Sequence, residues 1–97
     1  MIVIAKLKAQ NGKEAEVEKS LVEMVSKVSK EEGTIAYTLH RSQSDPTVFL
    51  FYEKYKDMAA FDYHKTTPYF QELFAVIGPL LDEEAVIDTY DEIVGIR

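Results

Sequence analysis

The residues best suited to acid–base chemistry lie near the middle of the chain, at Glu53 and His64. Glu53 interrupts an alternating run in which Phe49, Phe51 and Tyr55 occupy the same face of an expected strand. A carboxylate among aromatic side chains is costly to bury unless it is paired or protonated. The pattern therefore allows two interpretations. Glu53 is either a functional carboxyl group or a structural anchor for a backbone amide or a tyrosine hydroxyl.

His64 lies three residues after Phe61, so the two side chains share one face of an expected helix. Imidazole accepts and donates protons near neutral pH, which makes His64 a candidate base. The alternative is a structural histidine in the core or at a helix end. In the catalytic interpretation, His64 lies beside a pocket and contributes little to packing. The other histidine, His40, lies on the less apolar face of its strand and is not expected to be catalytic.

Several other chemistries are excluded by composition. The chain has no cysteine and two histidines, so disulfides, thiolate chemistry and a site with three or four metal ligands are not expected. The four glycines are scattered singly and form no phosphate-binding loop. Tyrosine hydroxyl groups could line a polar pocket, although such aromatic residues more often fill a core. These tyrosines are Tyr37, Tyr52, Tyr55 and Tyr69.

The 97 residues predict one domain, spanning positions 1–97. Seventeen acidic against 11 basic residues give a net charge of −6, which disfavours nucleic acid and anionic membranes as partners. The start, MIVIAKLK, has too few apolar residues for a signal peptide or a membrane span. Cytoplasmic residence is the default expectation.

The pattern predicts a strand at Ile2–Ala9, followed by a helix that ends at about Glu32. Asn11 stands three residues before Glu14, as in a capping box, and Gly33 is suited to a left-handed helix stop. The helix carries an apolar stripe of Val17, Leu21, Met24 and Val28, broadened by Val25.

The remaining pattern predicts two strands, two helices and a last strand. They are Thr34–Ser42, with Ile35, Tyr37 and Leu39 on one face; Val48–Tyr55; Met58–Lys65, capped by Asp57; a helix begun by Thr67-Pro68, with Phe70, Leu73, Phe74 and Ile77 on its buried face, and ended by Gly78-Pro79; and Ala85–Glu92. This order predicts an α+β, ferredoxin-like fold, with a four-stranded antiparallel sheet and helices on one face. Val48–Tyr55 is apolar on both faces, so the open face needs a second cover, which predicts a homodimer.

The segment EKYKDMAAFDYHKTTPYF, Glu53–Phe70, resembles the signature of the antibiotic biosynthesis monooxygenase family. In that signature a strand ends in glutamate, an aromatic residue follows two positions later, and a helix carries histidine before a Ser/Thr-Pro pair. Here these parts are Glu53, Tyr55, His64 and Thr67-Pro68. The order of elements fits the family over nearly the whole chain. The resemblance implies a dimeric α+β barrel in which the sheets of two protomers meet face to face.

The resemblance also implies a small-molecule substrate. Some family members oxygenate phenols or quinols without metal, flavin or haem, and we expect no cofactor here. His64 would be the base and Glu53 would orient it or hold water. The expected substrate-binding residues are Tyr37, Phe51, Tyr55 and Tyr69.

Two alternatives stay open. The run HKTTP and the later Gly78-Pro79-Leu80 resemble the branch that isomerises a phosphorylated signalling molecule, with Arg41 or Lys54 as candidate phosphate ligands. A non-catalytic dimeric binding module is the other alternative, favoured by a filled interior rather than a cavity at His64 and Glu53.

Two departures from the family pattern affect these expectations. Tyr69 stands where many relatives have a second histidine, which puts a two-histidine mechanism in doubt. Phe70, Leu73 and Phe74 occupy the region where haem-degrading relatives carry an axial histidine, so haem ligation is not expected.

Overall fold

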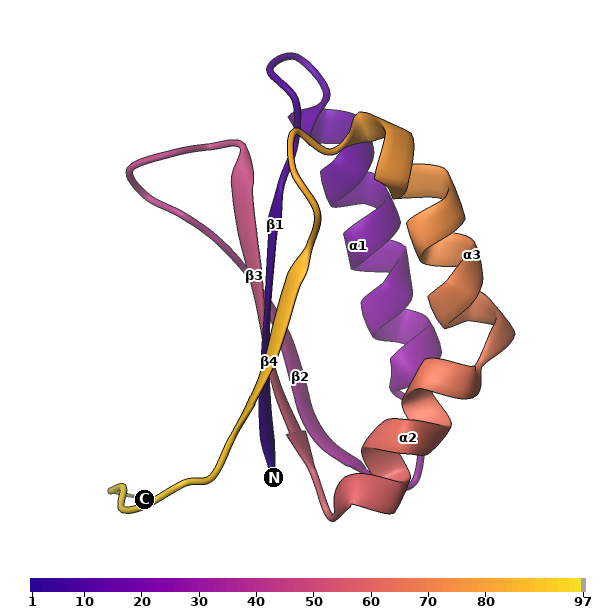
Figure 1. Cartoon of the computed structure of the whole chain (residues 1–97), viewed down its shortest axis with the longest axis vertical. Coiled ribbons are helices and arrows are strands. Elements are labelled where there is room, and N and C mark those ends of the chain that lie inside the picture. Colours follow the sequence, from indigo (N-terminus) through magenta and orange to yellow (C-terminus); the bar gives the residue numbers. More distant parts are fainter. Residues whose placement is uncertain (97) are drawn as a thin grey trace.

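Four antiparallel strands form one sheet, and all the helices lie on one of its faces (Figure 1). The computed structural model describes residues 1–96. The strands are β1 (Ile2–Lys8), β2 (Thr34–Arg41), β3 (Val48–Tyr55) and β4 (Val86–Tyr90), in the order β2-β3-β1-β4. The helices are α1 (Glu14–Val28), α2 (Met58–Thr66) and α3 (Pro68–Ile77), followed by the 3₁₀ turn η1 (Gly78–Leu80). The ferredoxin-like α+β architecture predicted from the sequence is confirmed.

The core lies between the sheet and α1. The predicted stripe of α1 is buried completely or nearly so: Val17, Leu21, Met24 and Val28 are at most 2% exposed. It packs against Ala5 and Leu7 of β1 and Phe49 and Phe51 of β3, which point to the helix side because alternate strand residues share a face. Each such side chain contributes about 1.5–3 kcal/mol when fully buried. This packing holds α1 against the side of the sheet on which the candidate site also lies.

The start of α1 differs from the predicted capping box. Lys13, not Asn11, is the N-cap residue, and it makes no side-chain cap hydrogen bond. Instead the Gly12 N–H donates to the Glu14 carboxylate over 2.9 Å. Gly12 has φ +87°, a left-handed conformation that glycine adopts without a Cβ penalty. The turn before the helix therefore displaces the cap by two residues.

The end of α1 also differs from the prediction. The helix stops at Val28, so Glu31 lies in the connection to β2 rather than on the helix. Gly33 is not in the left-handed region. It is instead the point where this connection meets α2, and the Lys56 N–H donates to its carbonyl over 2.9 Å. A Cβ built on Gly33 would overlap the Cβ of Ala60, so close approach, not backbone conformation, requires glycine here.

We expect Gly33→Ala to lower the free energy of unfolding by about 1–3 kcal/mol, the usual cost of overpacking. For a domain of this size each kcal/mol corresponds to a fall in Tm of about 4–8 °C. Thermal denaturation followed by circular dichroism measures it. Gly78→Ala is the matched control, because no atom lies within 4 Å of its added Cβ and Gly78 has helical dihedral angles. Equal Tm values for the two variants would contradict the close approach.

Two side-chain caps place the helices that carry His64. The Asp57 carboxylate accepts from the Ala60 N–H over 2.9 Å at the start of α2. The Thr67 hydroxyl accepts from the Phe70 N–H over 3.3 Å at the start of α3, and Pro68 occupies its first turn. Both predicted helix starts are confirmed. Thr67 therefore ends α2 and begins α3, so the chain turns sharply just after His64.

The edge strand β2 contains an irregularity that the alternation did not predict. Its pairing with β3 shifts between Thr34 and Ala36, which is the signature of a β-bulge. The shift turns Ile35 away from the face that it was expected to share with Tyr37 and Leu39, and Ile35 is 61% exposed. Tyr37 keeps its predicted place facing the helices. The last strand, β4, is also shorter than expected.

Within residues 1–96, no helix lies on the other face of the sheet (Figure 1). It is partly apolar: Tyr52 pairs with Ile4, and Leu50 pairs with Lys6, which in turn pairs with Val86. Val86 and Tyr90 are each 52% exposed. The apolar residues of this outer face are Ile2, Ile4, Val48, Leu50, Tyr52, Val86 and Tyr90. Its polar residues include Lys6, Thr38, His40, Lys54 and Asp88.

Candidate active site

A small aromatic cavity lies between the helix-facing side of the sheet and helices α2 and α3. The volume that the centre of a water molecule can occupy in this cavity is about 20 Å³, so the cavity has room for roughly one water. All four strands and both helices contribute to its wall. The lining residues are Ala5, Leu7, Tyr37, Phe51, Glu53, Phe61, His64, Phe70, Leu73, Phe74 and Ile87.

His64 is buried in this wall and is 1% exposed. Its Nδ1 lies 3.0 Å and 3.2 Å from the two carboxylate oxygens of Glu31. Aromatic rings surround the imidazole: Phe70 meets it edge-on at 5.2 Å between ring centroids, and Tyr37 and Tyr55 each lie at 5.5 Å. His64 is thus packed on several sides, contrary to the expectation that it contributes little to packing.

Glu31 is itself buried, with 8% of its surface exposed, and it has hydrogen-bond partners on three elements. The Tyr69 hydroxyl, from the first turn of α3, donates a short hydrogen bond to Oε2. The Thr34 hydroxyl, at the start of β2, donates to Oε1 over 3.4 Å. Together with His64 on α2, these contacts give the carboxylate a partner on each side. A buried carboxylate needs such donors, because burial removes its hydration.

Glu53 is a second buried carboxyl group on the cavity wall, and it is 3% exposed. Its Oε1 accepts from the Tyr55 hydroxyl over 2.6 Å. Burial raises the pKa of Glu53 to about 7, the Tyr55 hydrogen bond opposes that rise, and the negative charge of Glu31 adds to it. Near neutral pH a large share of Glu53 is therefore a neutral acid that can donate a proton.

Tyr37 and Phe51 complete the aromatic wall, with ring centroids 4.6 Å apart. Burial raises the pKa of the Tyr37 hydroxyl above its usual value, and the charges of Glu53 and Glu31 raise it further. Tyr37 therefore stays protonated and can donate a hydrogen bond to an oxygen atom in the cavity.

Four of the six residues predicted from the sequence line one cavity: His64, Glu53, Tyr37 and Phe51. Tyr55 and Tyr69 do not. Tyr55 lies behind Glu53 and bonds its carboxyl group, while Tyr69 bonds Glu31. Each of the two buried carboxyl groups is thus held by one tyrosine hydroxyl.

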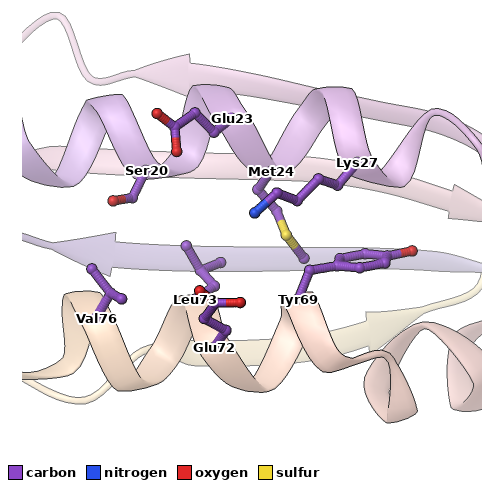
Figure 2. A pocket seen from close by; sticks show the side chains of 8 residues that line it. All are labelled: Ser20, Glu23, Met24, Lys27, Tyr69, Glu72, Leu73 and Val76. Atoms are coloured by element: carbon purple, nitrogen blue, oxygen red, sulfur yellow. The ribbon is translucent and has the colours of Figure 1, made fainter.

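Tyr69 also borders a separate groove between α1 and α3 (Figure 2). Figure 2 shows the Met24 side chain reaching from α1 toward the Tyr69 ring, with Lys27 beside it. The groove measures about 110 Å³ and is larger than the aromatic cavity. However, neither His64 nor Glu53 lines it. We therefore place the candidate chemistry in the smaller cavity.

Glu31 is the site residue that sequence reasoning missed. The helix was expected to continue to about Glu32, which placed Glu31 on it, and no spacing links Glu31 to a histidine 33 positions away. The expectation that Glu53 orients His64 is not supported by contacts, because Nδ1 of His64 bonds Glu31 instead. A buried carboxylate in a helix-to-strand connection is recognisable only once the fold is known.

The two basic residues considered for a phosphate lie elsewhere. Arg41 is exposed at the end of β2 and forms an ion pair with Glu18 of α1. Lys54 points to the outer face of the sheet, opposite Ile2. The residues lining the cavity include no lysine or arginine.

Neither a metal cluster nor a membrane-spanning helix occurs in the described part of the chain. Across residues 1–96, no three His, Cys, Asp or Glu side chains are grouped so that they could hold a metal ion. Within the same range, no helix is long and apolar enough to cross a membrane.

Known proteins share this sequence pattern and this fold. The model of the antibiotic biosynthesis monooxygenase family matches residues 1–76, which include β1 through almost all of α3 and both His64 and Glu53. The chain belongs to the antibiotic biosynthesis monooxygenase family. The family resemblance noted in the Glu53–Phe70 segment is thereby confirmed.

Solved structures of the family share the whole fold. A crystal structure of an antibiotic biosynthesis monooxygenase has a TM-score of 0.90 and 29% identity, covering 97% of this chain and 100% of that one. A Caulobacter crescentus protein provisionally assigned as such a monooxygenase has a TM-score of 0.89 and 35% identity, covering 96% of this chain and 89% of its own. An uncharacterised Synechocystis protein is 38% identical over 60 residues, which are 62% of this chain and 41% of that protein. This family member thus spans about two fifths of that curated relative.

Proposed function

We propose that this chain is a cofactor-independent monooxygenase acting on a small phenolic or quinol-type substrate. The single observation that carries the proposal is His64, held at Nδ1 by Glu31 and lining an aromatic cavity. The imidazole supplies a base, and the surrounding Tyr37, Phe51 and Phe70 rings suit a flat aromatic molecule. Relatives named as monooxygenases have the same fold over nearly the whole chain.

In the proposed reaction His64 takes the proton of a substrate hydroxyl. The resulting phenolate is electron-rich, and its ring carbon forms a bond to molecular oxygen, which gives a hydroperoxide after protonation. Loss of water from the hydroperoxide yields the quinone. One oxygen atom thus enters the product and the other leaves as water. Glu53, whose pKa burial raises to about 7, is placed to donate a proton, and Tyr37 to bind a substrate oxygen.

The cavity must widen before an aromatic ring can enter, since about 20 Å³ holds roughly one water. Phe70 and Phe74 are the half-buried members of its wall on α3, with ring centroids 5.1 Å apart. We propose that movement of these two rings admits the substrate. The same small volume is the observation that favours a non-catalytic module. The activity test therefore has to separate the monooxygenase from the non-catalytic module.

Oxygen uptake is the experiment that tests the proposal. The purified chain is mixed with a panel of small phenols and hydroquinones, and an oxygen electrode and product analysis are read together. We expect uptake in proportion to quinone formation, one labelled oxygen atom in the product under ¹⁸O₂, and no turnover under nitrogen. Turnover of a phosphorylated ketone that is equal in air and nitrogen would instead establish an isomerase. Binding without turnover of any candidate would establish the non-catalytic module.

The isomerase has less support from the site. A phosphate dianion needs cationic or clustered N–H donors. Arg41 and Lys54 do not line the cavity, and no other lysine or arginine does so. The chemistry of the wall therefore matches an uncharged aromatic molecule better than a phosphorylated one.

We further propose that two chains pair through the outer face of the sheet. Of the apolar residues on that face, Val86 and Tyr90 are each 52% exposed, and Ile93, Val94 and Ile96 beyond β4 are at least 86% exposed. Exposed apolar area of this kind marks an interface. In Figure 1 this last segment runs away from the sheet, where a second copy could receive it.

Sedimentation velocity at micromolar concentration is expected to report a dimer. Leu50→Lys should shift it toward monomer, because the new charge lies beside Lys6 on the outer face. Val76→Lys is the control, since Val76 is 51% exposed on α3, in the helix layer. A monomeric wild-type protein, or equal dissociation by both variants, would refute this interface.

A further inference from the structure

The least explained group in the molecule is the buried carboxylate of Glu31. It does not line the aromatic cavity, yet it is 8% exposed and bonds the one histidine that does. We propose that Glu31 is the positioning residue of His64: it holds the Nδ1–H tautomer of the neutral imidazole and so keeps the Nε2 lone pair available in the cavity. The catalytic part of this inference rests on the proposed function, whereas the tautomer can be observed without any substrate.

The donors around Glu31 define its state. An ionised carboxylate only accepts hydrogen bonds, and the Tyr69 and Thr34 hydroxyls both donate to it. His64 Nδ1 lies 3.0 Å from Oε2 in the same cluster, so the imidazole completes the set as a third donor. A proton on Nδ1 leaves Nε2 of a neutral imidazole unprotonated. Within residues 1–96, Nε2 of His64 makes no hydrogen bond that would compete for its lone pair.

Glu53 cannot serve the same purpose. It lies on the cavity wall, but its Oε1 accepts from Tyr55, and no hydrogen bond joins it to either nitrogen of His64 in the described residues. The two carboxyl groups therefore divide the work. Glu31 bonds the Nδ1 side of the imidazole and fixes which nitrogen carries the proton, while Glu53 lines the cavity where the substrate would bind.

Tyr69 gains a role from the same geometry. Its hydroxyl donates to Oε2 of Glu31, the oxygen that is also nearer to His64 Nδ1. It therefore fixes the carboxylate rather than touching the cavity. The residue that follows Pro68 thus acts through Glu31, as a second positioning residue and not as a second base.

The first test is the nitrogen-15 spectrum of the two histidine rings, recorded at mildly alkaline pH without substrate. His40→Gln identifies the signals, because the chain has two histidines. For wild type we expect His64 to carry its proton on Nδ1. In Glu31→Gln the new amide NH₂ can donate to Nδ1, so the Nδ1–H population should fall. Glu32→Gln, at the exposed neighbouring carboxylate, should leave it unchanged.

Two results would overturn the assignment: a wild-type His64 protonated mainly on Nε2, or an unchanged tautomer in Glu31→Gln. The wild-type spectrum decides the matter even if the variant does not fold. With a substrate in hand, Glu31→Gln should lower kcat by roughly 10²-fold with little change in KM, since Glu31 does not line the cavity. If the wild-type protein turns over no member of the panel of phenols and hydroquinones, the proposed function is refuted, but the tautomer result still stands. Normal kcat in a variant with the altered tautomer would refute the catalytic part alone.

Discussion

Replacing His64 with glutamine is expected to lower kcat by a factor of about 10² to 10⁴, the usual contribution of a general acid–base group. Glutamine is close in size to histidine, and its amide can still donate to Glu31, so the buried carboxylate keeps a partner. It cannot take the substrate proton at neutral pH. The loss should therefore appear in steady-state oxygen uptake while the Tm changes little.

Alanine is the poorer substitution at this position. Because His64 is 1% exposed and bonds Glu31, His64→Ala would leave a cavity and a buried carboxylate with one partner fewer. Removing one partner of a buried hydrogen bond costs about 1–3 kcal/mol, and the cavity adds to that cost. His40→Gln is the matched control, since His40 is exposed and contacts Thr38 on the outer face. Unchanged kcat in His64→Gln would show that His64 is a structural histidine.

Glu53→Gln is expected to make the protein more stable than wild type above about pH 7 by about 3 kcal/mol. The pKa of Glu53 is raised in the folded chain from 4.5 to about 7, and each pKa unit corresponds to about 1.4 kcal/mol. The folded state thus binds the Glu53 proton more tightly than the unfolded state does. Wild-type stability falls as the pH rises from about 4.5 to 7, and the cost is complete above that range. Glutamine has no charge to bury, so it escapes this cost.

Urea denaturation of wild type and variant at one protein concentration, near pH 4.5 and near pH 8, measures the difference. Glutamine keeps an acceptor for the Tyr55 hydroxyl, so the local packing is matched. Glu83→Gln, at an exposed carboxylate, controls for the loss of one charge. A pH-independent difference between Glu53→Gln and wild type would contradict the raised pKa.

The two carboxyl groups explain how one small cavity can hold both a base and an acid. Among the described residues, Glu31 has three hydrogen-bond partners and does not line the cavity, whereas Glu53 has one partner and lies on the cavity wall. Environments that separate titratable groups in this way mark acid and base assignments. The expected consequence is a bell-shaped pH dependence of kcat/KM, with Glu53 contributing to its alkaline limb.

The sequence by itself determined the layers of this protein. The apolar residues of α1 repeat with the period of a helix, at Val17, Leu21, Met24 and Val28. Those around Phe49 and Phe51 repeat with the period of a strand. The buried face of each element can therefore be predicted from its own residues. The caps at Asp57 and Thr67 are equally local, because a capping side chain bonds a backbone N–H three residues away. The family signature from Glu53 to His64 follows from the same short range.

The tertiary structure decided what surrounds those residues. Glu31 reaches His64 only because α1 ends at Val28 and the following connection, with Gly33 against Ala60, folds over α2. Tyr69 does not line the predicted pocket, because the turn at Thr67-Pro68 places the first turn of α3 beside Glu31. No sequence period encodes such contacts, since they join residues 33 and 38 positions apart whose meeting depends on how two helices pack. The candidate base, His64, was therefore recognisable from local sequence, whereas the carboxylate that bonds it was decided by the fold.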